Sequence, residues 1–404
     1  MIATAVSSTT LPTFDSCIVT DAPEQRTFED GLQIPFVLSP TTSHVAIDTL
    51  EKAVKFVQQN RTQIDQMLEE RGAVLFRGFP LASPHDFNLF VQAFHGYTDL
   101  SYEKSMSFAV RTKFKDANRI CTTNEGRSGG LVFHHEQAQT PLWPSHVFFC
   151  CQLPAQPGDG GETGIVSSPL VYDELRKRHP EFCTKLETYG VRYTVFAGPE
   201  SDPSKGAGRS WKSFFHVNSK EECEQKMIAG GWTWEWGVGP SNTITSSTTT
   251  NSTAVGKDYL KCITPVLEAV KNKQGRKCFF NQLIATTANS LEFSKVGGNG
   301  NGNGDGGNRG YDPLVDIPTQ DGIDECVRFG NSDAVSLEIL LEAKLICEEL
   351  AVNISWQQGD VALLSNYLMM HARRPWNGPE GTRKLLASLV QEENCTSFGR
   401  PLVV

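Results

Sequence analysis

His134 and Glu136 lie two residues apart and offer an imidazole and a carboxylate, which are both common metal ligands. On a β-strand, residues i and i+2 point to the same face, so the two side chains would enter one cavity. His371 is the best third ligand, because it follows Gly359–Leu364, a stretch that predicts a turn and a buried strand. Two histidines and one carboxylate on one face of a metal leave the opposite face open. That arrangement is typical of non-haem Fe(II) oxygenases.

A His-x-Glu sequence alone is weak evidence, since most such pairs are ordinary surface or core residues. Two further features strengthen it. Thr163 follows Gly160-Gly161-Glu162, 27 residues after the glutamate, and Arg383 lies 12 residues after the second histidine. An arginine fork can bind a carboxylate through two hydrogen bonds, so Arg383 is a candidate clamp for an anionic ligand. Lys384 is the alternative clamp, although it would face the other side of the same strand.

Taken in order, these motifs resemble the taurine dioxygenase and clavaminate synthase-like family of Fe(II)/2-oxoglutarate oxygenases. That family has His-x-Asp/Glu, then Gly-Gly-x-Thr, then a distal His and then Arg, and Phe133–Ala138 is similar to its Phe-His-x-Glu-x-Ala. The resemblance extends from about Gly72 to Glu392, with two insertions. Trp211-Lys212-Ser213 and His371-Ala372-Arg373-Arg374-Pro375 are similar to the plant and fungal clavaminate synthase-like branch.

The resemblance implies a role for each motif. His134, Glu136 and His371 would hold Fe(II), and 2-oxoglutarate and O2 would be co-substrates. Thr163 and Arg383 would hold the distal carboxylate of 2-oxoglutarate. The implied reaction is the oxidation of an unactivated C–H bond of a small metabolite by hydroxylation, desaturation or oxidative ring closure. An amino acid or a related metabolite is the substrate expected from the resemblance alone.

The substrate side is less defined by the sequence. The family's approach loop borders its substrate pocket, which makes Asn124 and Glu125 candidate substrate contacts, with a solvated loop as the equal alternative. The family often has another Arg four residues after its clamp, where this chain has Ala387. That difference argues against an anionic substrate bound in the manner of taurine. Two other classes stay open: a zinc-type metal hydrolase that uses the same ligands, and a non-catalytic jelly-roll ligand-binding protein.

Composition limits the remaining possibilities. The net charge of −9 over 404 residues gives no electrostatic support for nucleic-acid binding. No apolar run is long enough to cross a membrane, and the N-terminus does not resemble a signal peptide. The 11 cysteines include no Cys-x-x-Cys pair, which favours buried free thiols in a reducing compartment. We therefore expect a cytoplasmic enzyme with a small-molecule substrate and no nucleic-acid or membrane partner; a homo-oligomer is left open.

The predicted elements place these residues in one β-rich domain. We expect a mostly β chain with surrounding helices, folded as a double-stranded β-helix, or jelly roll, over residues 46–404. Residues 1–45 are expected to form an irregular N-terminal arm, and residues near 243–256 and 297–310 to be flexible insertions, because they consist largely of Ser, Thr, Asn and Gly.

Helical periodicity and strand-like apolar runs set the expected order of elements. A helix or a helix pair is predicted at 46–71. Further helices are predicted from Ser83 to Phe94, at 169–186 and at 333–350, the last with Asp333 as its N-cap. Strands are predicted at 72–79, as a pair within 147–168, before His371, and at 382–390.

Overall fold

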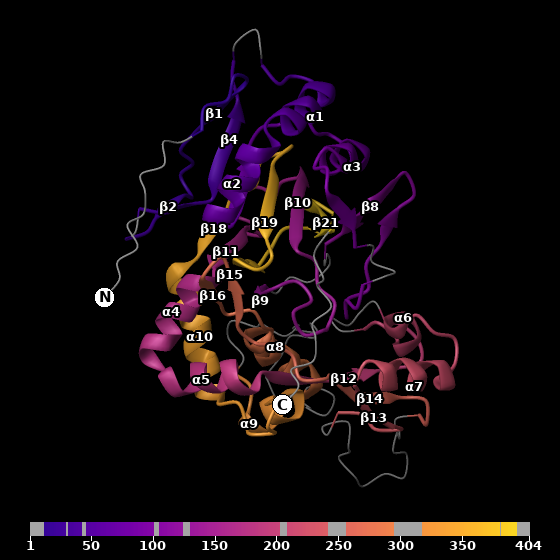
Figure 1. Ribbon diagram of the computed structural model, residues 1–404. Coiled ribbons are helices and arrows are strands. Elements are labelled where there is room, and N and C mark those ends of the chain that lie inside the picture. Colours follow the sequence, from indigo (N-terminus) through magenta and orange to yellow (C-terminus); the bar gives the residue numbers. More distant parts are fainter. Residues whose placement is uncertain are drawn as a thin grey trace, which may run out of the picture.

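The computed structural model describes residues 12–29, 31–42, 46–100, 105–123, 130–202, 208–240, 256–294, 317–379 and 381–393. Asn124, Glu125 and both expected insertions, except Gly256, lie outside these ranges. The described chain is mixed α/β, with several antiparallel sheets and with helices on their outer faces (Figure 1). The expectation of a mostly β chain therefore underestimated the helical content.

The largest sheet contains nine strands from the described residues. They are β1 (Cys17–Val19), β4 (Phe36–Pro40), β5 (Ala73–Phe76), β6 (Tyr97–Asp99), β7 (Lys113–Phe114), β8 (Ala117–Thr122), β10 (His146–Leu153), β19 (Val361–Ser365) and β21 (Lys384–Glu392). Their order is β1-β4-β5-β19-β10-β21-β8-β7, with β6 also paired to β21, and only β4 and β5 run parallel. The expected irregular arm is thus wrong for β1 and β4, which extend this sheet at its edge.

A second, smaller sheet faces the first. Its strands, in spatial order, are β18 (Val352–Ile354), β11 (Thr163–Ser167), β20 (Met369–Arg373) and β9 (Leu131–His134). Side chains alternate along β10: Val147 and Phe149 pack with Ile165 of β11, whereas Phe148 packs on the opposite side. The two sheets therefore enclose a common apolar layer, as alternation along a strand requires.

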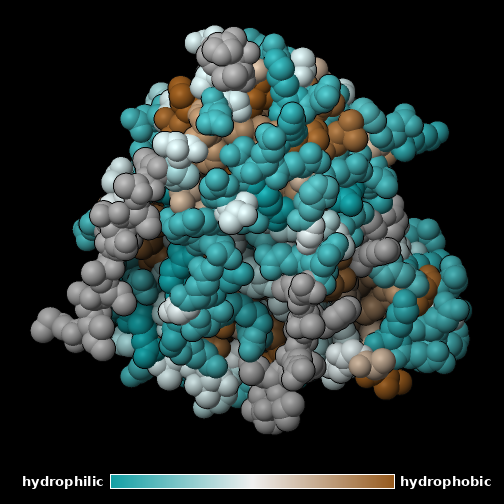
Figure 2. All heavy atoms as spheres, turned by 45° about the horizontal axis from the view of Figure 1, so that its top comes forward, coloured by the Kyte–Doolittle hydropathy of each residue, from teal (hydrophilic) through white to brown (hydrophobic). Residues whose placement is uncertain are grey.

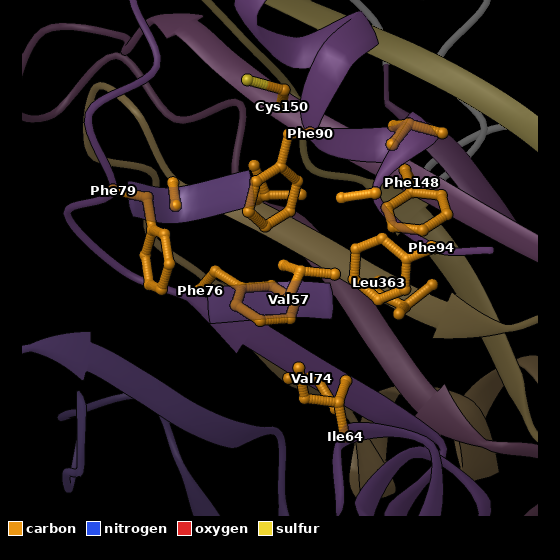
Figure 3. Packing of buried hydrophobic residues seen from close by; sticks show 14 of the residues in the cluster. Val57, Ile64, Val74, Phe76, Phe79, Phe90, Phe94, Phe148, Cys150 and Leu363 are labelled. Carbon is orange, nitrogen blue, oxygen red and sulfur yellow. The ribbon is translucent and has the colours of Figure 1, made fainter. Parts of the chain in front are cut away.

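Three helices cover the outer face of the large sheet: α1 (Leu50–Gln59), α2 (Arg61–Arg71) and α3 (Pro84–Gln92). Of the helix or helix pair predicted at 46–71, the structure has the pair, and Ser83 caps α3, where the sequence predicted a helix start. Figure 3 shows the aromatic core beneath them, in which Phe76, Phe90, Phe94 and Phe148 meet edge to face. This burial fixes the sheet that carries one wall of the site.

A second group of helices contributes to the apolar core on the outer face of the small sheet: α4 (Ser168–Arg178), α5 (Pro180–Tyr189), α8 (Leu283–Ser294), α9 (Gln320–Cys326) and α10 (Leu337–Leu350). Pro180 separates α4 from α5, so the predicted helix at 169–186 is two helices. The prediction of Asp333 as an N-cap is wrong. Ser336 caps α10 by accepting from Ile339 N, and Asp333 pairs with Lys185 instead.

A lobe projects at the lower right of Figure 1 and has its own apolar core. It comprises β12 (Val191–Ala197), β13 (Thr233–Trp236), β14 (Leu260–Ile263), α6 (Trp211–Phe215) and α7 (Lys220–Ala229), and β17 (Val327–Phe329) extends its sheet. Two short hairpins complete the described elements: β2 (Arg26–Thr27) with β3 (Gln33–Ile34), and β15 (Lys271–Lys273) with β16 (Arg276–Cys278).

The surface in Figure 2 is mostly hydrophilic, with hydrophobic atoms in small separate groups. Among the described residues, no helix has the length and apolar character needed to cross a membrane. The ten cysteines of the described chain are all buried and free, which confirms the expectation for these thiols.

Candidate active site

His134, Glu136 and His371 converge between the two sheets. His134 on β9 and His371 on β20 are register partners, and their ring centroids are 4.3 Å apart. Glu136 Oε2 lies 3.7 Å from His371 Nε2. One ligand atom from each of the three residues can be chosen so that all lie within 4.8 Å of one another. The structure therefore brings together the three residues that the sequence predicted.

The route by which Glu136 reaches the cluster differs from the prediction. Strand β9 ends at His134, so Glu136 lies in the following turn, where Gln137 adopts a positive φ of 59°. Asn366 holds the Glu136 backbone from both sides: its Oδ1 accepts from Glu136 N at 2.8 Å, and its Nδ2 donates to Glu136 O at 3.0 Å. A turn fixed by Asn366, rather than strand alternation, aims this carboxylate.

The protonation states suit a metal ligand set. His134 Nδ1 lies 2.9 Å from Val132 O, so the network assigns its proton to Nδ1 and leaves the Nε2 lone pair for an ion. Burial, together with the neighbouring His371, lowers the pKa of His134 to about 4. Burial alone would raise the pKa of Glu136, but the charge of Arg111 and the contact with His371 hold it well below its usual range. A neutral imidazole and an ionised carboxylate are the forms that bind a divalent cation.

His135 points away from this cluster, as strand alternation predicted. Its Nε2 lies 2.9 Å from Ser168 Oγ, its Nδ1 contacts the Asn366 carbonyl, and its ring packs on Phe280. His135 is therefore a buried, hydrogen-bonded residue of the core behind the site.

A second group of polar residues lies along the same inner face. Thr163 is the register partner of Arg373, two residues along β20 from His371, so all three side chains share one side of the sheet. Thr163 is buried, and its hydroxyl oxygen accepts from Trp356 Nε1 at 2.9 Å. Arg383 is buried and immediately precedes β21 of the facing sheet.

The Gly-Gly pair explains how Arg383 reaches this position. Gly161 has φ of 81°, and a Cβ there would lie 2.8 Å from Arg383 Nε. Only glycine both tolerates that backbone conformation and leaves room for the side chain. Arg383 Nε donates to Gly161 O at 2.9 Å. The Lys384 ammonium instead lies over the Phe114 ring, 5.6 Å from its centroid, so it does not compete for the same space.

One cavity connects these groups, with about 510 Å³ of empty space when its open mouth is included. Its wall contains the three candidate ligands, Thr163, Arg383, Phe149, Leu131, Leu385, Thr123, Ala372, Arg373 and Arg111. The candidate metal ligands and the two candidate carboxylate-binding residues therefore face one common space.

Sequence reasoning missed four residues around this cavity. Arg373 was given no role in ligand binding, although its i+2 spacing from His371 would have placed it on the ligand face. Nothing in the spacing of Asn366, Trp356 or Arg111 indicated their contacts, because each meets its partner across the fold.

Comparison with known proteins decides the family. The model of the "Taurine catabolism dioxygenase TauD, TfdA family" matches residues 39–389, most of the chain. The chain belongs to the TauD/TfdA dioxygenase family. A clavaminate synthase-like protein of Arabidopsis thaliana is 33% identical over 378 residues, covering 92% of this chain and 98% of that protein. The dapdiamide synthesis protein DdaC of Enterobacter agglomerans is 25% identical over 339 residues, covering 82% of this chain and 87% of that protein.

Solved structures of similar proteins include a taurine dioxygenase from Burkholderia xenovorans, with 12% identity, a TM-score of 0.43, and coverage of 88% of this chain and 86% of that one. Membership of this TauD/TfdA family rests on the sequence matches. It identifies the chain as an Fe(II)/2-oxoglutarate-dependent dioxygenase, and the donor set of two imidazoles and one carboxylate fits that metal.

Proposed function

We propose that this TauD/TfdA dioxygenase oxidises an unactivated C–H bond of a small metabolite. The observation that carries the proposal is that two groups of residues line one cavity. The first is the three candidate metal ligands, and the second is Thr163 and Arg383, which can bind a carboxylate. A metal hydrolase would need the first group but has no use for the second. A non-catalytic binding protein would need no metal ligands at all.

His134, Glu136 and His371 would hold Fe(II) in this cavity. Bound iron would provide chemistry that protein side chains lack, namely the reaction of O2 with 2-oxoglutarate. Arg383 and Thr163 would bind the distal carboxylate of 2-oxoglutarate, Arg383 through its charge and Thr163 through its hydroxyl proton. Both groups are buried, so their bonds to a carboxylate would be shielded from water.

We propose a double-stranded β-helix as the frame of the single catalytic domain. The two facing sheets support this arrangement, since the strands that carry the candidate ligands lie in the small sheet and the strand after Arg383 lies in the large one. Such a frame places ligands from distant parts of the chain on two rigid walls.

The cavity is lined mostly by buried residues, which suits a small metabolite. The similarity to a dapdiamide synthesis protein supports a substrate from metabolite synthesis, and an amino acid or related compound remains the proposed class. The proposed outcomes are hydroxylation, desaturation and oxidative ring closure, and the substrate determines which of them occurs.

The test combines binding with turnover. The protein is loaded anaerobically with Fe(II) and 2-oxoglutarate, candidate amino acids are added, and the mixture is exposed to O2 and analysed for succinate and for mass changes in each substrate. Wild type should bind 2-oxoglutarate with a visible charge-transfer band and form succinate. His134→Ala, Glu136→Ala and His371→Ala should lose both, while the exposed control His85→Ala should keep both. Zinc-dependent hydrolysis without O2 consumption would contradict the proposal.

A further inference from the structure

The two oxygens of the Glu136 carboxylate have different neighbours. Oε1 accepts from Arg111 Nη2 at 3.1 Å, while Oε2 lies 3.7 Å from His371 Nε2. Both partners of the ion pair are buried, with 10% of the Arg111 side chain and 6% of the Glu136 side chain exposed. Oε2 is therefore the oxygen placed against the imidazole of His371, and Oε1 is the one paired with Arg111.

We propose that Arg111 is a positioning residue that restricts Glu136 to one-oxygen ligation of the metal. The inference rests on the proposed function, in which Fe(II) and 2-oxoglutarate share this cavity. A carboxylate can bind a metal ion through one oxygen or through both. An oxygen that accepts a charge-assisted bond from a guanidinium is a weaker donor to a cation, and the bond fixes the orientation of the carboxylate.

The consequence concerns the open face of the metal. If both Glu136 oxygens bound the ion, the protein would occupy one more coordination position. Fewer positions would then remain for 2-oxoglutarate and O2, which both need the face opposite the protein ligands. The contact with Arg111 thus protects the cofactor site, although Arg111 itself need not touch the cofactor.

Arg111 is itself held in place by the projecting lobe. Arg209, which precedes α6, donates through Nη1 to Ser105 O at 2.8 Å and to Ser107 O at 3.3 Å, and its own N–H donates to Phe108 O at 3.0 Å. The Phe108 ring stacks on Phe214 of the lobe, with ring centroids 5.0 Å apart and an interplanar angle of 15°.

The lobe therefore fixes the backbone three residues before Arg111. On the other side, Arg111 Nη1 lies 3.9 Å from Cys121 Sγ of β8 in the large sheet. With its backbone anchored by the lobe and its guanidinium resting on a strand, Arg111 can hold Glu136 Oε1 in a defined orientation.

Two other roles predict different measurements. If Arg111 only supported the shape of the site, its loss would weaken metal binding. If Arg111 bound the substrate, its loss would leave metal and 2-oxoglutarate binding intact and would raise only the substrate requirement. A positioning role predicts a third pattern: metal binding is kept or strengthened, and 2-oxoglutarate binding is weakened.

The experiment uses Co(II), whose visible spectrum reports the number of ligands, with wild type, Arg111→Met, Arg111→Lys and Arg119→Met. Calorimetry gives the affinity for Co(II) and then for 2-oxoglutarate. Arg111→Met should bind Co(II) at least as tightly as wild type, up to about tenfold tighter, because a positive charge near the ion is removed.

The same Arg111→Met variant should bind 2-oxoglutarate about tenfold more weakly, a loss of about 1.4 kcal/mol in binding free energy. Its Co(II) spectrum should also differ from that of wild type. Arg111→Lys should recover part of that loss, because an ammonium can still engage Oε1. Arg119→Met is the matched control: it also removes a guanidinium from the β8 region, but the Arg119 side chain donates to Tyr97 O, away from the cluster.

Infrared difference spectra of 13C-glutamate-labelled wild type with and without metal give a measurement that needs no variant. A wide separation of the two carboxylate stretches indicates one-oxygen binding, and a narrow one would overturn the inference. Weaker Co(II) binding in Arg111→Met, or unchanged 2-oxoglutarate binding, would also overturn it. Failure of wild type to bind Co(II) and 2-oxoglutarate would instead contradict the proposed function.

Discussion

The indole N–H of Trp356 donates to the Thr163 hydroxyl oxygen at a distance of 2.9 Å, and this bond determines the direction in which the hydroxyl can donate its own proton. Because Thr163 Oγ accepts from Trp356, its own proton is directed elsewhere and can be donated into the cavity that Thr163 lines. Trp356 lies two residues after β18, and Thr163 begins β11, the neighbouring strand of the small sheet. The bond therefore orients the hydroxyl from within the same wall of the proposed 2-oxoglutarate site.

Thr163→Val should weaken 2-oxoglutarate binding by about tenfold, because valine keeps the shape of the side chain and removes one hydrogen bond of roughly 1–1.5 kcal/mol. Trp356→Phe should have a smaller effect in the same direction, since the hydroxyl stays but loses its orientation. Titration of 2-oxoglutarate into the anaerobic Fe(II) form, followed by charge-transfer absorption, measures both. Unchanged binding in Thr163→Val would remove this residue from the cofactor site.

Arg383→Ala should raise the 2-oxoglutarate dissociation constant by about ten- to a hundredfold, because a charge-assisted bond is worth roughly 1.5–3 kcal/mol. Affinity for the metal should stay nearly constant. Lys384→Ala is the matched control, since its ammonium lies over Phe114 rather than in the cavity. The same titration decides between them, and a loss confined to Lys384→Ala would reverse the assignment.

The sequence predicted which residues are candidate ligands better than it predicted the contacts that position them. His134, His371, Thr163 and Arg383 were identified from ordered motifs, and alternation along β21 places Arg383 on the same face as the inner residues Leu385 and Ala387. Strand alternation is a local property, so it can be read from a single stretch.

The contacts that hold these ligands depend on tertiary structure. Asn366 reaches the turn at Glu136 across 230 positions of sequence, and Arg111 reaches the same residue across 25 positions. No local periodicity encodes such pairs. The assignment of Glu136 to a strand failed for this reason: Asn366 fixes a turn where alternating residues suggested a continuing strand.

Asn366→Leu should destabilise the protein and weaken metal binding together. Leucine has a similar size but leaves Glu136 N, Glu136 O and Pro144 O without the partner that Asn366 gives them. Leaving such groups unsatisfied costs about 1–3 kcal/mol each when they are buried, so a loss of several kcal/mol in unfolding free energy is expected.

The measurements for Asn366→Leu are urea unfolding and Co(II) titration. Asn88→Leu is the control, because Asn88 is also buried but accepts from Arg119 N, away from the cluster. The control should lower the unfolding free energy without changing the affinity for the metal. Normal Co(II) affinity in Asn366→Leu would mean that the turn keeps its geometry without this amide.

His146 at the start of β10 should make the protein more sensitive to acid. Its ring is buried and stacks on Tyr97, with ring centroids 4.7 Å apart. Burial, aided by the charges of Lys273 and Arg61, lowers the pKa of His146 to about 3. The Glu392 carboxylate lies 3.7 Å from its Nε2 and would oppose this shift, but Glu392 is 41% exposed, so water weakens its effect.

The sign of the effect follows from proton binding. Below a pH of about 6.5 the unfolded chain protonates this histidine, whereas the folded protein does so only near the lowered pKa of about 3. The stability contributed by neutral His146 is therefore complete above about pH 6.5 and is lost progressively as the pH falls toward 3. His146→Phe, which keeps the aromatic contact with Tyr97, should reduce the slope of unfolding free energy against pH by roughly 1.4 kcal/mol per unit in this window. Urea unfolding between pH 4 and 7 measures that slope, and parallel curves for wild type and variant would contradict the prediction.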